Sequence, residues 1–245
     1  SLLNQLQQEL TADDPDTVRI VKIVGQDVAL TAAVLRTVNS PFYALSRQVE
    51  SLGQAMMFLG MRQISSLVLG LVLRKSLGER GPNLTRFWDV STKRSYAMLR
   101  LARLIGGIEP DQAQTFGLFC DIGIPLLMQR FPNDYVETLK LANADPTRGF
   151  CEVEQARHHT DHALVGALMG RTWCLSQTQC LAIRMHHDYR ALGDPGMPDS
   201  VARLVAASLL AERAIHLHAG MNASAEWDKG GEAALMVLMM SDADV

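Results

Sequence analysis

Apolar residues recur at three- and four-residue steps through the segment from Gln26 to Val72, which is the pattern of helices with one buried face. The apolar runs are separated by residues that end helices, so the segment predicts three helices joined by two turns. Pro41 disfavours helical geometry at the residue before it, and we therefore expect the first helix to end near Asn39. A chain built around such a segment is constrained to a helical fold.

The second and third helices of this segment are delimited by a capping signal and a glycine. Ser51 is followed three residues later by Gln54, and this spacing is typical of a capping box at a helix N-terminus. Gly60 is predicted to end the second helix. The third begins at Met61, and its apolar stripe is so wide that we expect other helices to enclose almost all of it.

The rest of the chain shows the same helical period, and no segment has the two-residue period of a strand. Two glycines, a proline and an asparagine gather between residues 77 and 85, which predicts a boundary between two helical lobes. We therefore expect an all-α protein. The other predicted helices span residues 2–10, 17–25, 86–105, 110–119, 124–130, 133–142, 150–157, 161–173, 176–187, 199–218 and 232–240.

Charge and composition argue against several classes of function. The net charge of −3 and a pI near 6.1 supply no overall positive field, so neither nucleic acid nor an anionic membrane is expected as a partner. The pair Lys93 and Arg94 suits a solvated helix face. Because no stretch of about 18 uninterrupted apolar residues and no signal-peptide pattern occurs, we expect a cytoplasmic protein. The four cysteines form no CxxC pair, which argues against a disulfide framework and a zinc knuckle.

Several short motifs carry a resemblance to a known family. The sequence has Gln26-Asp27, then NSPFY from Asn39 to Tyr43, then SLGQA from Ser51 to Ala55 and the pair Leu59-Gly60. In this order and spacing the motifs resemble the N-terminal half of HDOD domains, which are helical, HD-related output domains of bacterial signal-transduction proteins. The resemblance extends over roughly residues 15 to 215.

The resemblance implies a fold and a function. The whole chain, residues 1–245, is expected to form a single HDOD-like domain, with an N-terminal helical lobe over about residues 1–80 and a degenerate HD-domain-like lobe over about residues 85–245. We expect a non-catalytic signalling or regulatory module, comparable to the output part of a response regulator. It would relay the state of a sensor or receiver domain outside this chain through protein–protein contacts, and it is compatible with a homodimer.

The resemblance also implies where an HD-type metal site would lie. In HD-domain phosphohydrolases a helix histidine, an adjacent His-Asp pair and later His or Asp residues hold one or two divalent metals that activate water. Matched on the patterns around Phe87 and Phe119, this chain has Val90 in place of the first histidine and Cys120 in place of the histidine of the pair. The vestigial metal-site residues that remain are Asp121, His162, His186 and His187.

We expect no catalytic residue and no resident cofactor, because valine offers no lone pair to a metal. Cys120 could bind zinc as a thiolate, but its apolar neighbours favour a small buried hydrophobe. One alternative left open is a metal-dependent phosphohydrolase of a nucleotide or cyclic dinucleotide, using Mn, Fe or Zn on the altered shell. Another is a sensor that keeps the pocket without the chemistry and contacts an anion through Arg157, Arg184 or Arg190.

The histidine positions give two further expectations. Adjacent residues point about 100 degrees apart on a helix, so at most one of His186 and His187 is expected to face a given site, while the other ends the helix. His216 and His218 lie near the end of a predicted helix and are most simply surface residues.

Overall fold

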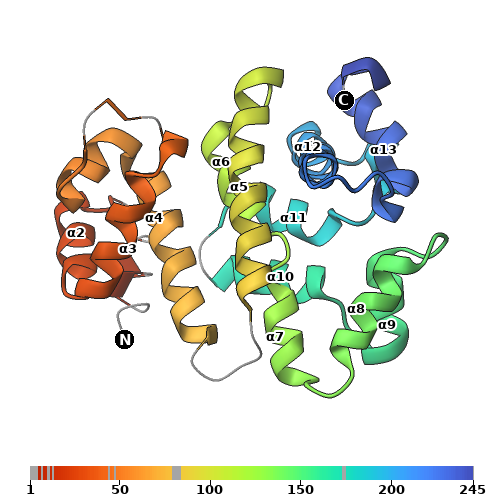
Figure 1. Cartoon of the computed structure of the whole chain (residues 1–245), viewed down its shortest axis with the longest axis horizontal. Helices are drawn as coiled ribbons and strands as arrows, with labels where there is room; N and C mark the ends of the chain where they lie inside the picture. Colours follow the sequence, from red (N-terminus) through yellow and green to blue (C-terminus); the bar gives the residue numbers. More distant parts are fainter. Residues whose placement is uncertain are drawn as a thin grey trace. The chain divides into compact units, whose positions relative to one another are not determined.

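The regular elements in the described part of the computed structural model are all helices (Figure 1), which confirms the all-α prediction. The chain divides into two compact units, Ser1–Arg80 and Gly81–Val245, and each is described by itself. That the two units act as one HDOD-like domain stays a prediction. Much of the predicted helix over residues 2–10 lies outside the described residues. The structure describes the chain except residues 1–4, 7, 10, 11, 13, 44, 47, 79–83, 173–174 and 245, and it describes only the backbone of residues 28, 29, 42, 76–78 and 242.

Two aspartates start helices in the first unit, because a carboxylate before a helix accepts a backbone N–H that has no partner inside it. Asp16 accepts from the N–H of Val18 at 2.8 Å, and Asp27 accepts from the N–H of Leu30 at 3.0 Å. Both lie where the apolar period predicts a helix to begin. The elements of this unit are α2 (Thr17–Gly25), α3 (Val28–Val38), η1 (Pro41–Tyr43) and α4 (Leu52–Gly78).

The loop between α3 and α4 is held by side chains from the sequence motifs. Asn39 follows the last residue of α3, as predicted, and its side chain donates to the carbonyl of Val49 and accepts from the N–H of the same residue, each at 2.7 Å. Ser51 accepts from the N–H of Gln54 at 3.2 Å, which confirms the capping signal. The side chain of Gln54 accepts from the N–H of Glu50 at 2.8 Å rather than from Ser51. These motifs therefore have a structural role in the loop.

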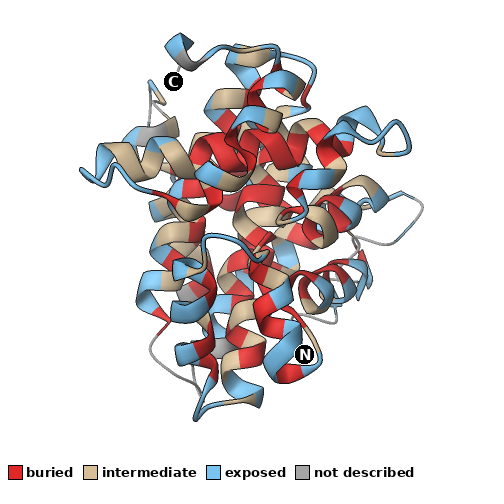
Figure 2. Ribbon diagram, turned by 90° about the vertical axis from the view of Figure 1, so that its right-hand side faces the viewer, coloured by how far each residue is buried: buried red, intermediate tan, exposed pale blue. Residues whose placement is uncertain are grey.

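Gly60 interrupts α4, as predicted, with a φ of 78° and a ψ of 164°, a region open almost only to glycine. By length and composition the stretch Leu52–Lys75 could cross a membrane, but a core helix meets the same test and the break at Gly60 divides this one. Figure 2 shows buried and exposed segments alternating along the helices, as amphipathic helices require. The apolar core of the first unit includes Ile20, Val24, Leu30, Val34, Val38, Val49, Leu52, Ala55, Met56, Ile64 and Val68.

The second unit consists of more and shorter helices. Its elements are α5 (Thr85–Ile105), α6 (Pro110–Phe119), α7 (Gly123–Arg130), α8 (Tyr135–Ala144), α9 (Phe150–His158), α10 (His162–Thr172), α11 (Gln177–Met185), η2 (Tyr189–Gly193), α12 (Asp199–His218), α13 (Ala225–Leu238) and η3 (Asp242–Asp244). α5 packs against α6 and α12, and α12 also contacts α11 and α13 (Figure 1). α10 packs against α7 and α11. The capping box at Ser176 and Gln179 starts α11, as predicted.

The last helix, α13, begins earlier than predicted, at Ala225 instead of residue 232. Ser224 caps it by accepting from the N–H of Trp227 at 3.3 Å. The pair Gly230-Gly231 resembles a turn in the sequence, but both glycines lie inside the helix. A Cβ at the first of them would clash with the ring of Tyr189, so this glycine lets the helix approach η2 closely.

Candidate functional site

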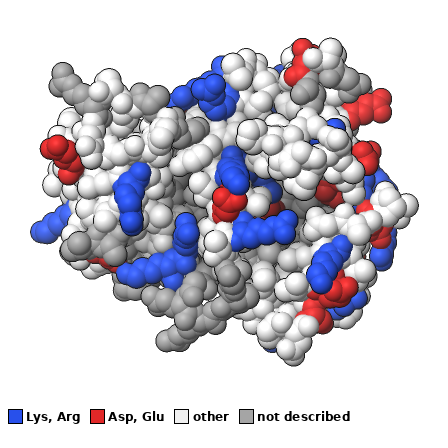
Figure 3. Space-filling view, viewed as in Figure 1, with Lys and Arg blue, Asp and Glu red and all other residues white. Residues whose placement is uncertain are grey.

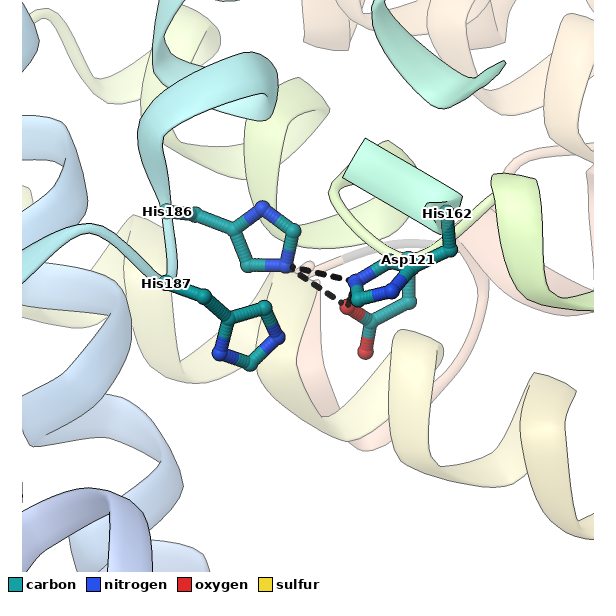
Figure 4. A group of neighbouring side chains, drawn as sticks. All are labelled: Asp121, His162, His186 and His187. Carbon is teal, nitrogen blue, oxygen red and sulfur yellow. Dashed lines mark hydrogen bonds and ion pairs between the residues drawn. The ribbon is translucent and has the colours of Figure 1, made fainter. Parts of the chain in front are cut away.

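The four predicted metal-site residues Asp121, His162, His186 and His187 lie together in the second unit (Figure 4). One possible ligand atom from each lies within 4.8 Å of the others. The aspartate comes from the turn between α6 and α7, the first histidine from the start of α10, and the last two from the end of α11. Segments far apart in sequence therefore build one cluster. The role of these residues as metal ligands stays a prediction.

Two local features bring the turn between α6 and α7 close to the start of α10. A Cβ at Gly123 would overlap the carbonyl oxygen of His162, so glycine is required for this close approach. Asp161 caps α10 by accepting from the N–H of Leu164 at 2.7 Å. The cap fixes the first turn of α10, and with it the direction of the histidine side chain toward Asp121.

Three donor atoms form a small triangle in this cluster. Nε2 of His186 lies 3.0 Å from Oδ1 of Asp121 and 3.2 Å from Nε2 of His162. The third side, from Nε2 of His162 to Oδ1 of Asp121, is 3.6 Å. Bonds of about 2.0–2.1 Å to a single zinc ion would place neighbouring ligand atoms roughly 3 Å apart, so the spacing matches one face of a metal site.

The orientation of the two histidines is set by their other ring nitrogens. Nδ1 of His162 lies 2.7 Å from a carboxylate oxygen of Glu154, and the hydroxyl of Tyr135 donates to the same carboxylate. Nδ1 of His186 lies 2.7 Å from the carbonyl oxygen of Ile183. Because both partners are acceptors, each Nδ1 donates, and each Nε2 is left to face the aspartate. Metal-binding histidines are commonly held in this way.

A cation of the protein already occupies one side of the cluster. Arg94 on α5 donates from Nη1 to Oδ2 of Asp121 at 2.5 Å and to the sulfur of Cys120 at 2.7 Å. Its Nη2 lies 3.8 Å from a carboxylate oxygen of Glu212 on α12. Only 6% of this arginine is exposed, so the prediction that it belongs to a solvated helix face is wrong, whereas its neighbour Lys93 is exposed.

The electrostatics of the cluster shift the pKa values of its three donor groups in different directions. Burial opposes ionisation of Asp121, but the guanidinium of Arg94 holds the pKa of this carboxyl well below its usual range. Burial likewise opposes the charged form of His162, yet Glu154 raises its pKa above 6.5. Burial lowers the pKa of His186 to about 4. Asp121 is therefore ionised and His186 neutral at pH 7, and a cation between Oδ1 of the first and Nε2 of the second would separate lone pairs that face each other at 3.0 Å.

The two replaced positions differ in their environment. Burial raises the pKa of Cys120 to about 12, and the residue is 1% exposed, so its thiol keeps its proton at neutral pH. This supports its interpretation as a buried hydrophobe with a weak hydrogen bond. Val90 lies one helical turn before Arg94 on α5 and lines a cavity beside the cluster. It presents only methyl groups there.

His187 connects the cluster to α13. Its Nδ1 lies 2.7 Å from Oε2 of Glu226, and the hydroxyl of Tyr189 donates to the same oxygen at 2.7 Å. The expectation that at most one of His186 and His187 faces the site is wrong, because α11 ends at Met185 and the angular rule for a helix no longer applies. Sequence reasoning missed Glu226 because it assigned this segment to a turn.

A cavity of about 770 Å³ opens beside the cluster. None of the three arginines considered for an anion contact, Arg157, Arg184 and Arg190, is among its described lining residues; Arg94 is. His216 also lines it and is half-buried, so its assignment to the surface is wrong, while His218 is exposed as expected. A space of this size is within the usual range for small-molecule sites.

The described part of the second unit is all-helical and brings three histidines and an aspartate together from the ends of its helices. The family model for the HDOD domain matches residues 1–189, and the chain belongs to the HDOD family. This confirms the resemblance carried by the sequence motifs.

Similar proteins place the chain within this fold. An uncharacterised protein of Treponema pallidum (strain Nichols) is 24% identical over 195 residues, which cover 77% of this chain and 37% of that protein. A crystal structure of a candidate phosphohydrolase from Shewanella amazonensis SB2B has a TM-score of 0.67 and 19% identity, covering 97% of this chain and 90% of that one. A candidate signal-transduction protein from Marinobacter aquaeolei VT8 has a TM-score of 0.67 and 22% identity, covering 97% of this chain and 55% of that one.

Proposed function

We propose that this chain is a non-catalytic signalling or regulatory output module of a bacterial protein. It relays the state of an attached or partner sensor through protein–protein contacts. The observation that carries the proposal is the buried ion pair between Arg94 and Asp121, at 2.5 Å, inside the cluster where an HD-type site would hold its metal. Membership of the HDOD family and the likeness to a candidate signal-transduction protein support a signalling role.

The positive charge of Arg94 opposes metal-dependent catalysis at this cluster. A metal-dependent phosphohydrolase needs a divalent cation to lower the pKa of water and to polarise the phosphate. Arg94 neutralises Asp121 and repels a second cation at short range in a buried site. Val90 and Cys120 remove two further ligands. The cluster then acts as a buried polar core that fixes the meeting point of α6, α10 and α11.

The second candidate function is a metal-dependent phosphohydrolase of a nucleotide or cyclic dinucleotide. The triangle of donor atoms favours it, as does the likeness to a candidate phosphohydrolase. Asp121, His162 and His186 would hold one Mn, Fe or Zn ion, with His187 beside them, and the ion would supply an activated water. Glu154 would keep the imidazole of His162 turned toward it.

Metal content separates the two functions. The full chain without a histidine tag is incubated with Mn, Fe or Zn, desalted, and analysed for bound metal beside Arg94→Met and Asp121→Ala. We expect the wild type to retain far less than stoichiometric metal. Arg94→Met should gain metal, because methionine keeps much of the volume and removes the charge. The matched control is Lys93→Met, which removes the same charge from the exposed face of α5 and should leave metal content unchanged.

The opposite result would identify the chain as a metal-dependent phosphohydrolase. Stoichiometric metal in the wild type that disappears in Asp121→Ala, together with hydrolysis of bis(p-nitrophenyl) phosphate or a cyclic dinucleotide, would overturn the non-catalytic proposal. Circular dichroism and thermal unfolding of each variant show whether a loss of metal reflects the site or the fold.

The proposed partner is a protein, and the proposed compartment is the cytoplasm. On the face shown in Figure 3, both basic and acidic side chains are exposed. Nucleic-acid binding would call for a continuous basic stripe or patch. A receiver or sensor domain outside this chain is therefore the first partner to test by co-purification with the full-length protein.

A further inference from the structure

The cavity beside the cluster is lined by both polar and apolar side chains. Three of the polar ones, Arg94, Glu212 and His216, are called its floor here, and the latter two lie one turn apart on α12. α12 follows residue 189, where the family match ends, so part of this floor comes from outside the matched segment. Apolar side chains that line the cavity include Phe87, Val90, Ile124, Met128, Leu139 and Phe150. This combination is typical of sites for small organic molecules.

The floor contains polar groups that protein atoms do not satisfy well. Nη2 of Arg94 and the carboxylate of Glu212 are 3.8 Å apart, which is too far for a hydrogen bond. Nδ1 of His216 is buried and has no hydrogen-bond partner in the described part of the chain. Buried polar groups are almost always paired, so a group such as Nδ1 of His216 on a cavity wall indicates a bound molecule or water.

The charges at the floor select the polar group of the ligand. An anion next to Arg94 would meet the carboxyl groups of Asp121, Glu212 and Glu226, which all line the cavity, whereas the lining cations Arg86 and Lys140 are exposed. A cation would meet the guanidinium of Arg94. A neutral group that both accepts and donates avoids both repulsions and satisfies a guanidinium and a carboxyl group at once. Burial raises the pKa of Glu212, so this side chain can also donate when it holds its proton.

We propose that this cavity binds a flat, apolar molecule with a carboxamide or lactam head. The carbonyl oxygen of the head accepts from Arg94, and its N–H donates to Glu212. The flat body lies against apolar wall residues such as Phe87 and Phe150. This inference goes beyond the proposed signalling function and holds whether or not the chain hydrolyses a phosphate.

Three probes with one ring and different heads test the proposal: benzamide, benzoate and benzamidine. Each is titrated into the full chain in the presence of EDTA, and binding is followed by NMR. Benzamide is expected to bind about tenfold more tightly than either charged probe, because each charged head meets a side chain of its own charge at the floor. EDTA separates this test from the metal test, so one can fail without the other.

Variants locate the site. Glu212→Gln keeps an acceptor and a donor at the floor and should leave benzamide affinity within about threefold. Glu212→Leu removes both and should lower the affinity about tenfold. Glu232→Leu makes the same chemical change on the exposed face of α13, outside the cavity lining, and should have no effect.

Three results would overturn the proposal. These are binding of benzoate or benzamidine as tightly as benzamide, benzamide binding that is unchanged in a folded Glu212→Leu, and no binding of benzamide up to its solubility limit. If Glu212→Leu does not fold, Arg94→Met supplies the second variant, and it should also weaken benzamide because it removes the donor to the carbonyl oxygen. The ranking of the three probes on the unmodified chain does not depend on any variant.

Discussion

The interiors of the two units are built from different chemistry. The core of the first unit is a contiguous set of aliphatic side chains, and among its described residues Glu9, which pairs with Arg19, is the buried ionisable side chain. The second unit buries many more. Its buried ionisable side chains include Arg94, Glu154, His158, Asp161, His162, His186 and Glu226.

The two interiors differ in what keeps them stable. Apolar packing is favourable by itself, whereas a buried charge costs free energy unless it is paired and hydrogen-bonded. Each charge in the cluster of the second unit has such a partner, for example Arg94 on Asp121 and Glu154 on His162. A protein that needed only stability would be served as well by apolar residues. The polar interior of the second unit is therefore where the candidate functional site is sought.

The largest effect is expected from Glu154→Ala. The substitution leaves Nδ1 of His162 and the hydroxyl of Tyr135 without their shared acceptor in a fully buried place. Breaking a buried pair by removing one partner costs about 3–5 kcal/mol of unfolding free energy. The loss of unfolding free energy is measured by urea denaturation at pH 7, with circular dichroism recording the unfolding of the second unit.

Glu154→Gln is the matched control, because it keeps the volume and one acceptor oxygen. We expect it to lose clearly less stability than the alanine variant. Equal losses in the two variants would show that packing volume, and not the hydrogen-bonded acceptor, makes this position important.

The next largest effect is expected from truncation of an apolar side chain in the core of the first unit. Ile64→Ala should cost about 3 kcal/mol, since Ile64 is 2% exposed and its removal leaves a cavity. No charge is involved, so the loss should be the same at acidic and neutral pH. Met57→Ala on the same helix is the control, because Met57 is 81% exposed and should change stability by less than about 0.5 kcal/mol. A strongly pH-dependent loss for Ile64→Ala would contradict the contrast between the two cores.

The pH dependence of the second unit should come in part from His186. Its pKa is lowered from 6.5 to about 4, so between these values the unfolded state binds more protons than the folded state. The contribution of this residue to stability is then lost as pH falls from 6.5 toward 4, and the loss amounts to about 2 kcal/mol near pH 5. His162 has the opposite sign, because its raised pKa gives stability below 6.5 that is lost as pH rises through its folded value.

His186→Gln removes the first of these titrations. Unfolding free energies of wild type and variant, measured from pH 7 down to pH 5, should therefore differ in slope. Parallel curves would mean that other groups dominate the acid sensitivity, and the environment assigned to His186 would have to be revised.

Most of the helices could be predicted from the sequence because their start and stop signals are local. Asn39, Ser51 and Ser176 act within a few residues of their own position, and each has the predicted role in a cap or turn. The chain positions of Asp121 and His162 followed from the family resemblance, and the structure brings them together. What a residue does next to its own helix can be inferred from spacing alone.

Arg94 and Glu226 were missed because their environment is not local. Arg94 follows Lys93 in a helix and looks solvated until α6 and α12 are packed against α5. Glu226 was hidden by Gly230-Gly231, which resembles a turn but permits close packing against Tyr189. Glu154 lies eight residues before His162, and this spacing was only a weak signal of their contact. Glutamate and histidine often occur this close in helical sequences without touching.

The smallest expected effect concerns the way the first unit holds its loops. Asn39→Ala removes both hydrogen bonds to the backbone of Val49, which is 2% exposed, and should cost about 2 kcal/mol. Asn143→Ala is the control, because its amide donates to Leu139 on an exposed surface and should change stability by less than about 0.5 kcal/mol. Thermal unfolding of both variants measures the difference. A loss at Asn39 as large as that of Glu154→Ala would mean that the first unit also depends on a polar centre, and the contrast between the two interiors would then be one of charge alone.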